Sequence, residues 1–228
     1  MKLTVATLFA ANALAAFAQG VPTVLTPCRD VTLASRIDSA LRPYEAKVGE
    51  RVRTGQVLVR ADDERYAIDY RKAKEQFEFM EATYADKLEL HKKDFCSDFE
   101  LKKAKFDAAL AEAAFREAEL NLGWCAFKAP FDGKFAEIAT KEYDPVKPGQ
   151  PVLRIIDDSK LFAVANVPMG TVKVGDKVRL AVGGVAAEGR VYEVAPHADS
   201  RTGTVRIRVL VENRDGKLMV GMTGTIDG

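Results

Sequence analysis

The sequence predicts a mainly β protein in which two similar half-sandwiches are separated by a long α-helical coiled-coil hairpin and followed by a small β-domain. Three observations predict this fold: an internal repeat at a fixed offset, a helical period between the two copies, and a run of short strand-like segments after residue 158. A repeat constrains the arrangement of the whole chain, so its elements are assigned first.

The repeat has an ungapped offset of 94 residues, which places Leu33–Asp63 over Phe127–Asp157. Both copies contain the motif Val-basic-x-Gly-Gln, at residues 52–56 and 146–150. Alternating apolar residues and an apolar run after the glycine indicate short strands joined by a tight turn, and glycine suits such a turn because it reaches positive φ. Neither half can bury its apolar face alone, so we expect the two halves to pack across a pseudo-two-fold axis.

Between the copies, apolar residues recur at alternating spacings of four and three, which is the a/d seam of a two-helix coiled coil. The chain is expected to turn near residues 94–96, and Ser97 with Glu100 has the spacing of a capping box. The outer faces are almost wholly Lys, Arg, Glu and Asp, which favours a projecting hairpin over helices packed on a globule. The predicted seam positions are Tyr66, Tyr70, Ala73, Phe77, Met80 and Tyr84 on the first arm and Leu101, Ala104, Ala108, Ala111, Phe115, Ala118 and Leu122 on the second.

After residue 158 the pattern becomes strand-like, with turn-rich segments between the apolar runs. The five candidate strands are residues 161–167, 177–182, 189–194, 204–211 and 222–226. Five short strands over about 70 residues predict a small barrel or sandwich.

The first residues have the layout of a secretory signal peptide. Lys2 precedes a mostly apolar run from Leu3 to Phe17, and Ala16-Phe17-Ala18 provides a small-x-small cleavage site. The run is shorter than the about 20 residues that a membrane-spanning helix needs. We expect cleavage after Ala18 and export, with an uncleaved anchor as the alternative. The expected boundaries are 1–18 for the signal, 19–63 and 125–158 for the two halves, 64–124 for the hairpin and 159–228 for the β-domain.

Charge and cysteine content narrow the function classes. Loss of Lys2 leaves 33 of the 34 basic residues against 33 acidic ones, so bulk charge recruits no nucleic acid. The long helix predicted between Cys96 and Cys125 holds them too far apart for a disulfide. Two alternatives remain: a disulfide between Cys28 and Cys125, or three free thiols that are buried as small apolar residues. The two histidines stand alone and no Cys-x-x-Cys occurs, so we expect no metal site and no cofactor.

An enzyme is not expected, because the sequence has no Gly-rich phosphate loop, no Gly-x-Ser-x-Gly elbow and no histidine with a nucleophile. The adjacent carboxylates Asp62, Asp63 and Glu64 begin the first helix, where the helix dipole favours negative charge. No catalytic residue is therefore assigned.

The ordered motifs resemble those of periplasmic adaptor proteins, also called membrane fusion proteins, which include efflux and HlyD-like secretion subunits. The motifs that carry the resemblance are Val48 to Leu58, Ala129-Pro130-Phe131-Asp132-Gly133, Val146 to Gln150, Gly189-Arg190-Val191, Ala195-Pro196, Thr204-Val205-Arg206 and Leu218 to Met222. The resemblance implies a biotinyl/lipoyl-like sandwich split by the hairpin. It also implies periplasmic localisation, association with the inner membrane through partners, a homo-oligomeric ring, and a role between an inner-membrane transporter and an outer-membrane exit duct.

In the family, the hairpin tip meets the duct, which makes Leu90, Phe95 and Ser97 the candidate partner-binding residues. Leu90 and Ser97 occupy the family's leucine and serine positions, but Asp86 stands where an arginine is usual. Leu90, Phe95 and Phe99 form an apolar group that either contacts a partner or closes the hairpin by internal packing.

Two other functions stay open. A carrier of a covalent cofactor would need a modified lysine, but the sequence has no Met-Lys-Met or Asp-Lys-Ala triplet and residues 64–124 occupy the junction where carriers hold it. A client-binding periplasmic module would use the hairpin to hold its client. The chain also has no segment resembling the family's membrane-proximal domain, so we expect that domain to be missing or minimal.

Overall fold

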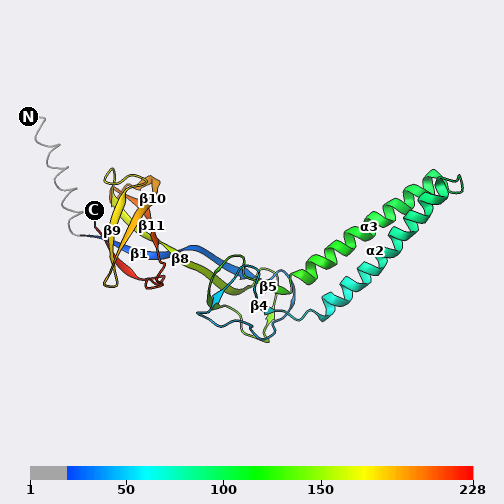
Figure 1. The fold of residues 1–228 in the computed structure, drawn as a ribbon, viewed down its shortest axis with the longest axis horizontal. Helices are drawn as coiled ribbons and strands as arrows, with labels where there is room; N and C mark the ends of the chain where they lie inside the picture. The colour runs from blue at the N-terminus through cyan, green and yellow to red at the C-terminus, as the bar shows by residue number, and fades with distance from the viewer. Residues whose placement is uncertain (1–19, 228) are drawn as a thin grey trace, which may run out of the picture. The chain divides into compact units, whose positions relative to one another are not determined.

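The structure is a computed structural model that describes residues 20–227 (Figure 1). The expected signal peptide, residues 1–18, lies outside the described residues. By their contacts, the described residues form two compact units. One unit runs from Thr32 to Arg154, and the other holds the residues up to Val31 together with those from Ile155 onward.

The second unit is a β-barrel. Its strands are β1 (Val21–Ala34), β8 (Pro151–Pro168), β9 (Lys177–Val182), β10 (Val185–Asp199), β11 (Thr204–Glu212) and β12 (Thr223–Asp227). They are hydrogen-bonded in the order β1-β12-β9-β10-β11-β8, and β8 pairs again with β1. The ring is therefore closed and leaves no free sheet edge. Alternate side chains fill the barrel, among them Leu25, Leu161, Leu180, Ile207 and Ile226, each at most 2% exposed.

The barrel differs from the sequence expectation because it has a strand from the N-terminal segment. Val21–Val24 pair antiparallel with Thr223–Ile226, whereas residues 19–63 were all expected in the first half-sandwich. Strand β8 also continues through Asp157, where the apolar run was expected to end. Its carboxylate accepts hydrogen bonds from Arg29 Nη2 at 2.7 Å and Ser159 Oγ at 2.6 Å, so the acidic side chain is accommodated without breaking the strand.

The first unit contains a sandwich built from the two repeat copies. Its strands are β2 (Ser39–Ala40), β3 (Arg51–Val52), β4 (Val57–Arg60), β5 (Ala126–Lys128), β6 (Gly133–Ile138) and β7 (Pro145–Val146), with the first residues of β8. Strand β2 pairs with β7 and β3 pairs with β6, so strands of one repeat copy are hydrogen-bonded to strands of the other. The pair Ser39–Val146 becomes Gly133–Val52 when the 94-residue offset is applied, as a two-fold relation requires.

Single hydrogen bonds repeat in the same way. Leu41 N donates to Asp144 O at 3.1 Å, and the equivalent Phe135 N donates to Glu50 O at 3.0 Å. The Val-basic-x-Gly-Gln motif also has a structural explanation: Gly55 and Gly149 take φ values of 81° and 86°, and the glutamine side chain that follows closes the turn. Gln56 Oε1 accepts from Arg53 N at 3.0 Å, and Gln150 Oε1 from Lys147 N at 3.2 Å.

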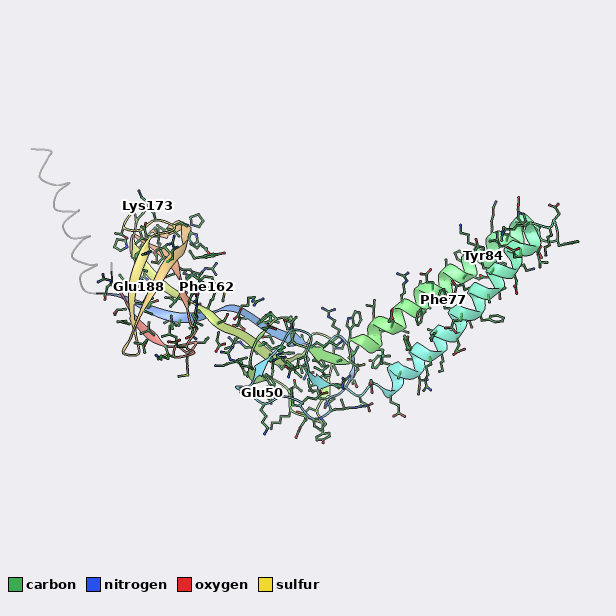
Figure 2. All side chains as sticks on the ribbon, viewed as in Figure 1. Glu50, Phe77, Tyr84, Phe162, Lys173 and Glu188 are labelled. Atoms are coloured by element: carbon green, nitrogen blue, oxygen red, sulfur yellow. The ribbon has the colours of Figure 1, made fainter. Side chains whose placement is uncertain are left out.

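Two helices are inserted between the sandwich halves: α2 (Glu64–His91) and α3 (Asp98–Gly123). The two helices pack along each other. The four buried residues of α3 are seam alanines: Ala104, Ala108, Ala111 and Ala118. Opposite them lie larger residues of α2 such as Phe77 and Tyr84 (Figure 2), and Phe115 stacks on Phe77 at 5.7 Å between ring centroids. None of the described helices has the length and apolar character that crossing a bilayer requires.

Candidate partner-binding site at the hairpin tip

The tip is a short turn between α2 and α3 that its main chain holds tightly. Phe95 N donates to Leu90 O at 2.9 Å and Asp94 N donates to His91 O at 3.0 Å. Asp94 has φ 62°, in the left-handed region that short polar residues such as Asp tolerate better than most. The turn therefore presents residues 92–97 in one defined conformation.

Ser97 begins α3 through the expected capping box. Its Oγ accepts from Glu100 N at 3.2 Å and donates to Glu100 Oε2 at 2.9 Å, while Ser97 N donates to the same carboxylate at 3.0 Å. These hydrogen bonds hold the pKa of Glu100 below its usual value. The hydroxyl donor of Ser97 is thus used within the turn, so we assign this residue to the shape of the tip.

His91 is a tip residue that the sequence did not single out. Its Nδ1 lies 2.8 Å from Cys96 O and its Nε2 lies 3.4 Å from Asp98 Oδ1. Because a carbonyl can only accept, Nδ1 must carry a proton and donate. The imidazole joins the end of α2 to the start of α3. A lone histidine has no sequence signal for this role, since one of its partners is a main-chain atom.

The apolar residues of the tip are exposed. Phe95 is 78% exposed, Phe99 76% and Leu90 41%. Side chains that closed the hairpin by packing on one another would be largely covered, so these fractions favour the alternative of a partner contact. Cys96, between them in sequence, is buried and fills the inside of the turn. Leu90 and Phe95 thus lie at the tip with surface free for a partner, and Asp86 is exposed one turn before Leu90.

The outer faces of the helices were expected to be almost wholly charged, but they also carry large apolar residues. Phe106 is 66% exposed, Phe79 65%, Leu110 61% and Leu120 55%. Charged residues dominate these faces in the sequence, and the apolar positions among them were not predicted. On α3 the available signal was the spacing of Phe99, Phe106, Leu110 and Leu120, which is seven, four and ten residues.

The described residues contain no group of three His, Cys, Asp or Glu side chains close enough to hold a metal ion. Cys28, Cys96 and Cys125 are free thiols. Burial, with a smaller effect from Asp63, raises the pKa of Cys125 to about 11, which disfavours the reactive thiolate.

Comparison with known proteins adds to this geometry. Residues 161–227 match the family described as CusB-like, beta-barrel domain. Nodulation protein NolF of Rhizobium meliloti strain 1021 is 28% identical over 87% of this chain, which spans only 59% of that relative. An uncharacterized protein of Haemophilus influenzae is 24% identical over 87% of this chain, which spans 54% of it.

Among solved structures, a MacA-MexA chimeric protein with the Pseudomonas aeruginosa MexA α-hairpin domain has a TM-score of 0.80 at 20% identity. The match covers 90% of this chain and 79% of the chimera. The membrane fusion protein Spr0693 of Streptococcus pneumoniae R6 has a TM-score of 0.71 at 15% identity, covering 90% of this chain and 96% of the other.

The predicted resemblance is therefore confirmed. Residues 161–227 match the model of the CusB-like β-barrel domain, and the chain has the fold of membrane fusion, or periplasmic adaptor, proteins.

Proposed function

We propose that the protein is an exported, non-enzymatic periplasmic adaptor that links an inner-membrane transporter to an outer-membrane exit duct during efflux or secretion. The observation that carries the proposal is the tip of the hairpin, where Leu90 and Phe95 are exposed at the end of two helices inserted into a cross-paired sandwich. Exposed apolar residues grouped at one end of an element favour a contact with a partner.

The rest of the chain supports the same role. The helices pair through a seam of aromatic and alanine residues, and we propose that they wind as a two-helix coiled coil that acts as a spacer. The closed barrel and the sandwich each have a buried apolar core, as structural modules need. We further propose that several copies form a ring, associated with the inner membrane through the transporter. As part of this proposal the sequence boundaries 64–124 of the hairpin are kept, while Val21–Val24 are assigned to the barrel and no longer to the first half-sandwich.

Cross-linking in membranes of cells that produce the protein, followed by identification of the copurified proteins, tests this function. An inner-membrane transporter and an outer-membrane duct protein are expected with the unchanged chain. Phe95→Asp and Leu90→Asp should each lose the duct protein and keep the transporter. Both substitutions change exposed side chains, so the free energy of unfolding should move by about 0.5 kcal/mol or less.

Val48→Asp is the matched control, because Val48 is an apolar residue of the sandwich that is 54% exposed and distant in sequence from the tip. It should retain both partners. Copurification of neither partner with the unchanged chain would refute the proposed function. Tip variants that keep the duct protein would remove Leu90 and Phe95 from the contact.

A further inference from the structure

The second copy of the sandwich repeat holds a tyrosine in a backbone conformation that suits glycine. Tyr143 has φ 68°, and its side chain is 69% exposed. This left-handed conformation is rare for a bulky residue, because it brings Cβ too close to the following carbonyl oxygen. Among the described residues, the other non-glycine residue with positive φ is Asp94, whose short polar side chain tolerates it better. Tyr143 is therefore kept in this turn at a cost in stability.

The repeat indicates which residue the turn itself favours. The 94-residue offset places Tyr143 over Gly49, which has φ 89°. The two positions make equivalent main-chain hydrogen bonds, since Tyr143 N donates to Leu41 O at 3.0 Å and Gly49 N donates to Phe135 O at 2.7 Å. A Cβ added to Gly49 would meet no heavy atom within 4 Å, so glycine is favoured there by φ and not by lack of space. The turn alone does not explain the ring of Tyr143.

The residues on either side of the tyrosine also differ from the first copy. Glu142 stands where the first copy has Val48, and Asp144 stands where it has Glu50. The Glu50 carboxylate is used within its own turn, where Oε2 accepts from Lys47 N at 2.9 Å. Within the described part of the chain, the side chains of Glu142 and Asp144 are exposed and form no hydrogen bond or ion pair. The second turn therefore presents an aromatic ring between two available carboxylates.

This combination of groups suits a cation. The face of a tyrosine ring attracts a Lys ammonium or an Arg guanidinium, and carboxylates pair with the same groups. Lys141 begins the turn, but Lys47 begins the equivalent turn as well, so the difference between the copies is an added ring and an added negative charge. A ring exposed on a turn does not enclose a small molecule, whereas tyrosine is prominent in contacts between proteins. The negative charge disfavours anionic lipid surfaces and nucleic acid.

We propose that the turn Glu142-Tyr143-Asp144 binds an Arg- or Lys-bearing segment of another protein, with the cation on the tyrosine ring and the carboxylates beside it. The turn lies where the sandwich meets the hairpin. Leu41, whose carbonyl accepts from Tyr143 N, pairs with Ala61, which is three residues before α2 begins. The hairpin tip takes no part in this contact, so the inference goes beyond the proposed function.

Thermal unfolding tests whether the ring serves the chain itself or a partner. Tyr143→Gly and Tyr143→Asn should each raise Tm by about 2–4 °C, because glycine and asparagine adopt positive φ more readily. Gly49→Tyr is the matched control in the first copy, and it should lower Tm by a similar amount. A lower Tm in both Tyr143 variants would show that the ring stabilises the protein itself, and it would overturn the inference.

Photo-cross-linking tests the partner. Photoreactive benzoylphenylalanine in place of Lys141, in cells that produce the protein, should capture a segment of another protein that has Arg or Lys beside the cross-linked position. The yield should fall by about five- to tenfold with Tyr143→Gly, and also with Glu142→Gln and Asp144→Asn together. Tyr143→Phe keeps the ring and should retain most of the yield. Added salt should lower the yield in isolated membranes, as expected for a charged contact.

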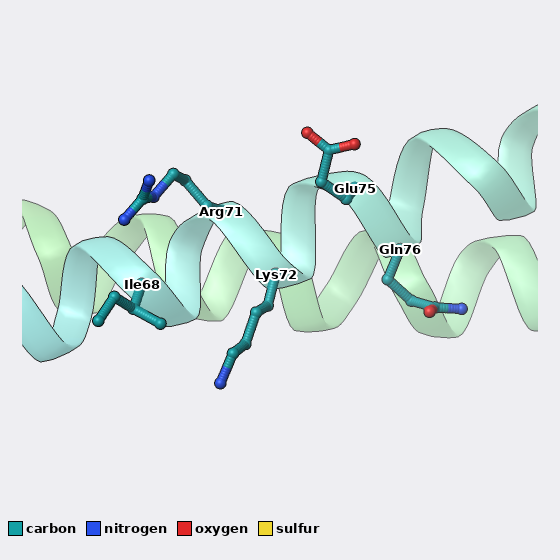
Figure 3. Close-up of a pocket in the computed structure, with 5 residues that line it drawn as sticks. All are labelled: Ile68, Arg71, Lys72, Glu75 and Gln76. Atoms are coloured by element: carbon teal, nitrogen blue, oxygen red, sulfur yellow. The ribbon is translucent and has the colours of Figure 1, made fainter.

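The same photoreactive residue in place of Ile68 provides a matched control. Ile68 is an apolar residue of α2 that is 38% exposed, but Arg71 and Lys72 lie near it instead of carboxylates (Figure 3). This position should not capture the segment. No cross-link from Lys141, or cross-links only to a second copy, to lipid or to a segment without Arg or Lys, would overturn the inference. Equal yields from Tyr143→Gly and the unchanged chain would do the same. The outcome does not depend on the proposed function, because the captured segment is identified by its own sequence.

Discussion

Replacing Tyr66–Leu122 by a six-residue Gly/Ser linker is expected to leave a folded β protein. The two ends of the hairpin start from paired strands, since Arg60 pairs with Ala126 and Ala61 N donates to Cys125 O at 2.7 Å. A flexible linker of six residues spans about 13 Å on average, more than the 8–10 Å between packed helix axes. The linker can therefore close the gap without strain.

The expected loss of stability follows from what the sandwich loses. The hydrogen bond from Tyr66 Oη to Asp38 O, 3.0 Å long, contributes about 1 kcal/mol. Closing a flexible loop of six residues costs about 1.6 kcal/mol. The sum of about 2 to 3 kcal/mol corresponds to a fall in Tm of roughly 5–12 °C for a protein of this size.

Scanning calorimetry and far-ultraviolet circular dichroism measure the outcome. The helical signal should disappear, and a cooperative transition should remain within that range of Tm. As a control, Phe135→Ala in the shortened protein should lower the free energy of unfolding by about a further 3–5 kcal/mol. Phe135 is fully buried and stacks on Tyr44, with 5.7 Å between the ring centroids. The sandwich core would not be self-sufficient if the shortened protein showed no cooperative transition. The same would follow if Phe135→Ala left its Tm unchanged.

Two further predictions concern the seam and the barrel. Phe115→Ala should destabilise the hairpin by about 2 to 3 kcal/mol, because the ring is half-buried, stacks on Phe77 and makes a tilted contact with Tyr70. Phe106→Ala should change the stability by about 0.5 kcal/mol or less. Hydrogen exchange along α2 measures both, and equal effects would contradict the seam. Burial raises the pKa of Asp157, but hydrogen bonds from Ser159 and Arg29 outweigh it, so the folded-state pKa is lowered. This stabilisation is present above the unfolded-state pKa of about 3.9 and is lost as pH falls through the folded-state value. Asp157→Asn should make the free energy of unfolding fall less steeply at acid pH. If the dependence of that free energy on pH is the same in the variant, Asp157 has no such effect.

The repeat and the helical seam could be predicted because their signals are periodic and lie within short windows. Tyr70, Phe77 and Phe115 meet where the alternation of threes and fours places them. Strand β1 was missed for the opposite reason. The alternating burial of Val21, Thr23 and Leu25 depends on β12, about 200 residues away, and nothing local indicates that partner.

The tip was predicted in part. The capping role of Ser97 follows from a three-residue spacing and is observed. Whether Leu90 and Phe95 are covered depends on how the turn directs them, which a list of residue types cannot decide. The exposed apolar residues on the outer faces of the helices, such as Phe79 and Phe106, were missed because charged residues outnumber apolar ones there.

The pairing of β1 with β12 determines when the barrel can close. A polypeptide leaves the ribosome, or an export channel, with its N-terminus first. The edge of Val21–Val24 that faces β12 must therefore wait unpaired until Thr223–Ile226 have emerged, although the other edge of β1 can pair with β8 earlier. Throughout that interval the segment is an open strand edge, the kind that joins other chains readily. We therefore expect the yield of folded protein to depend on covering this short segment during synthesis, by a chaperone, or on rapid export of the chain.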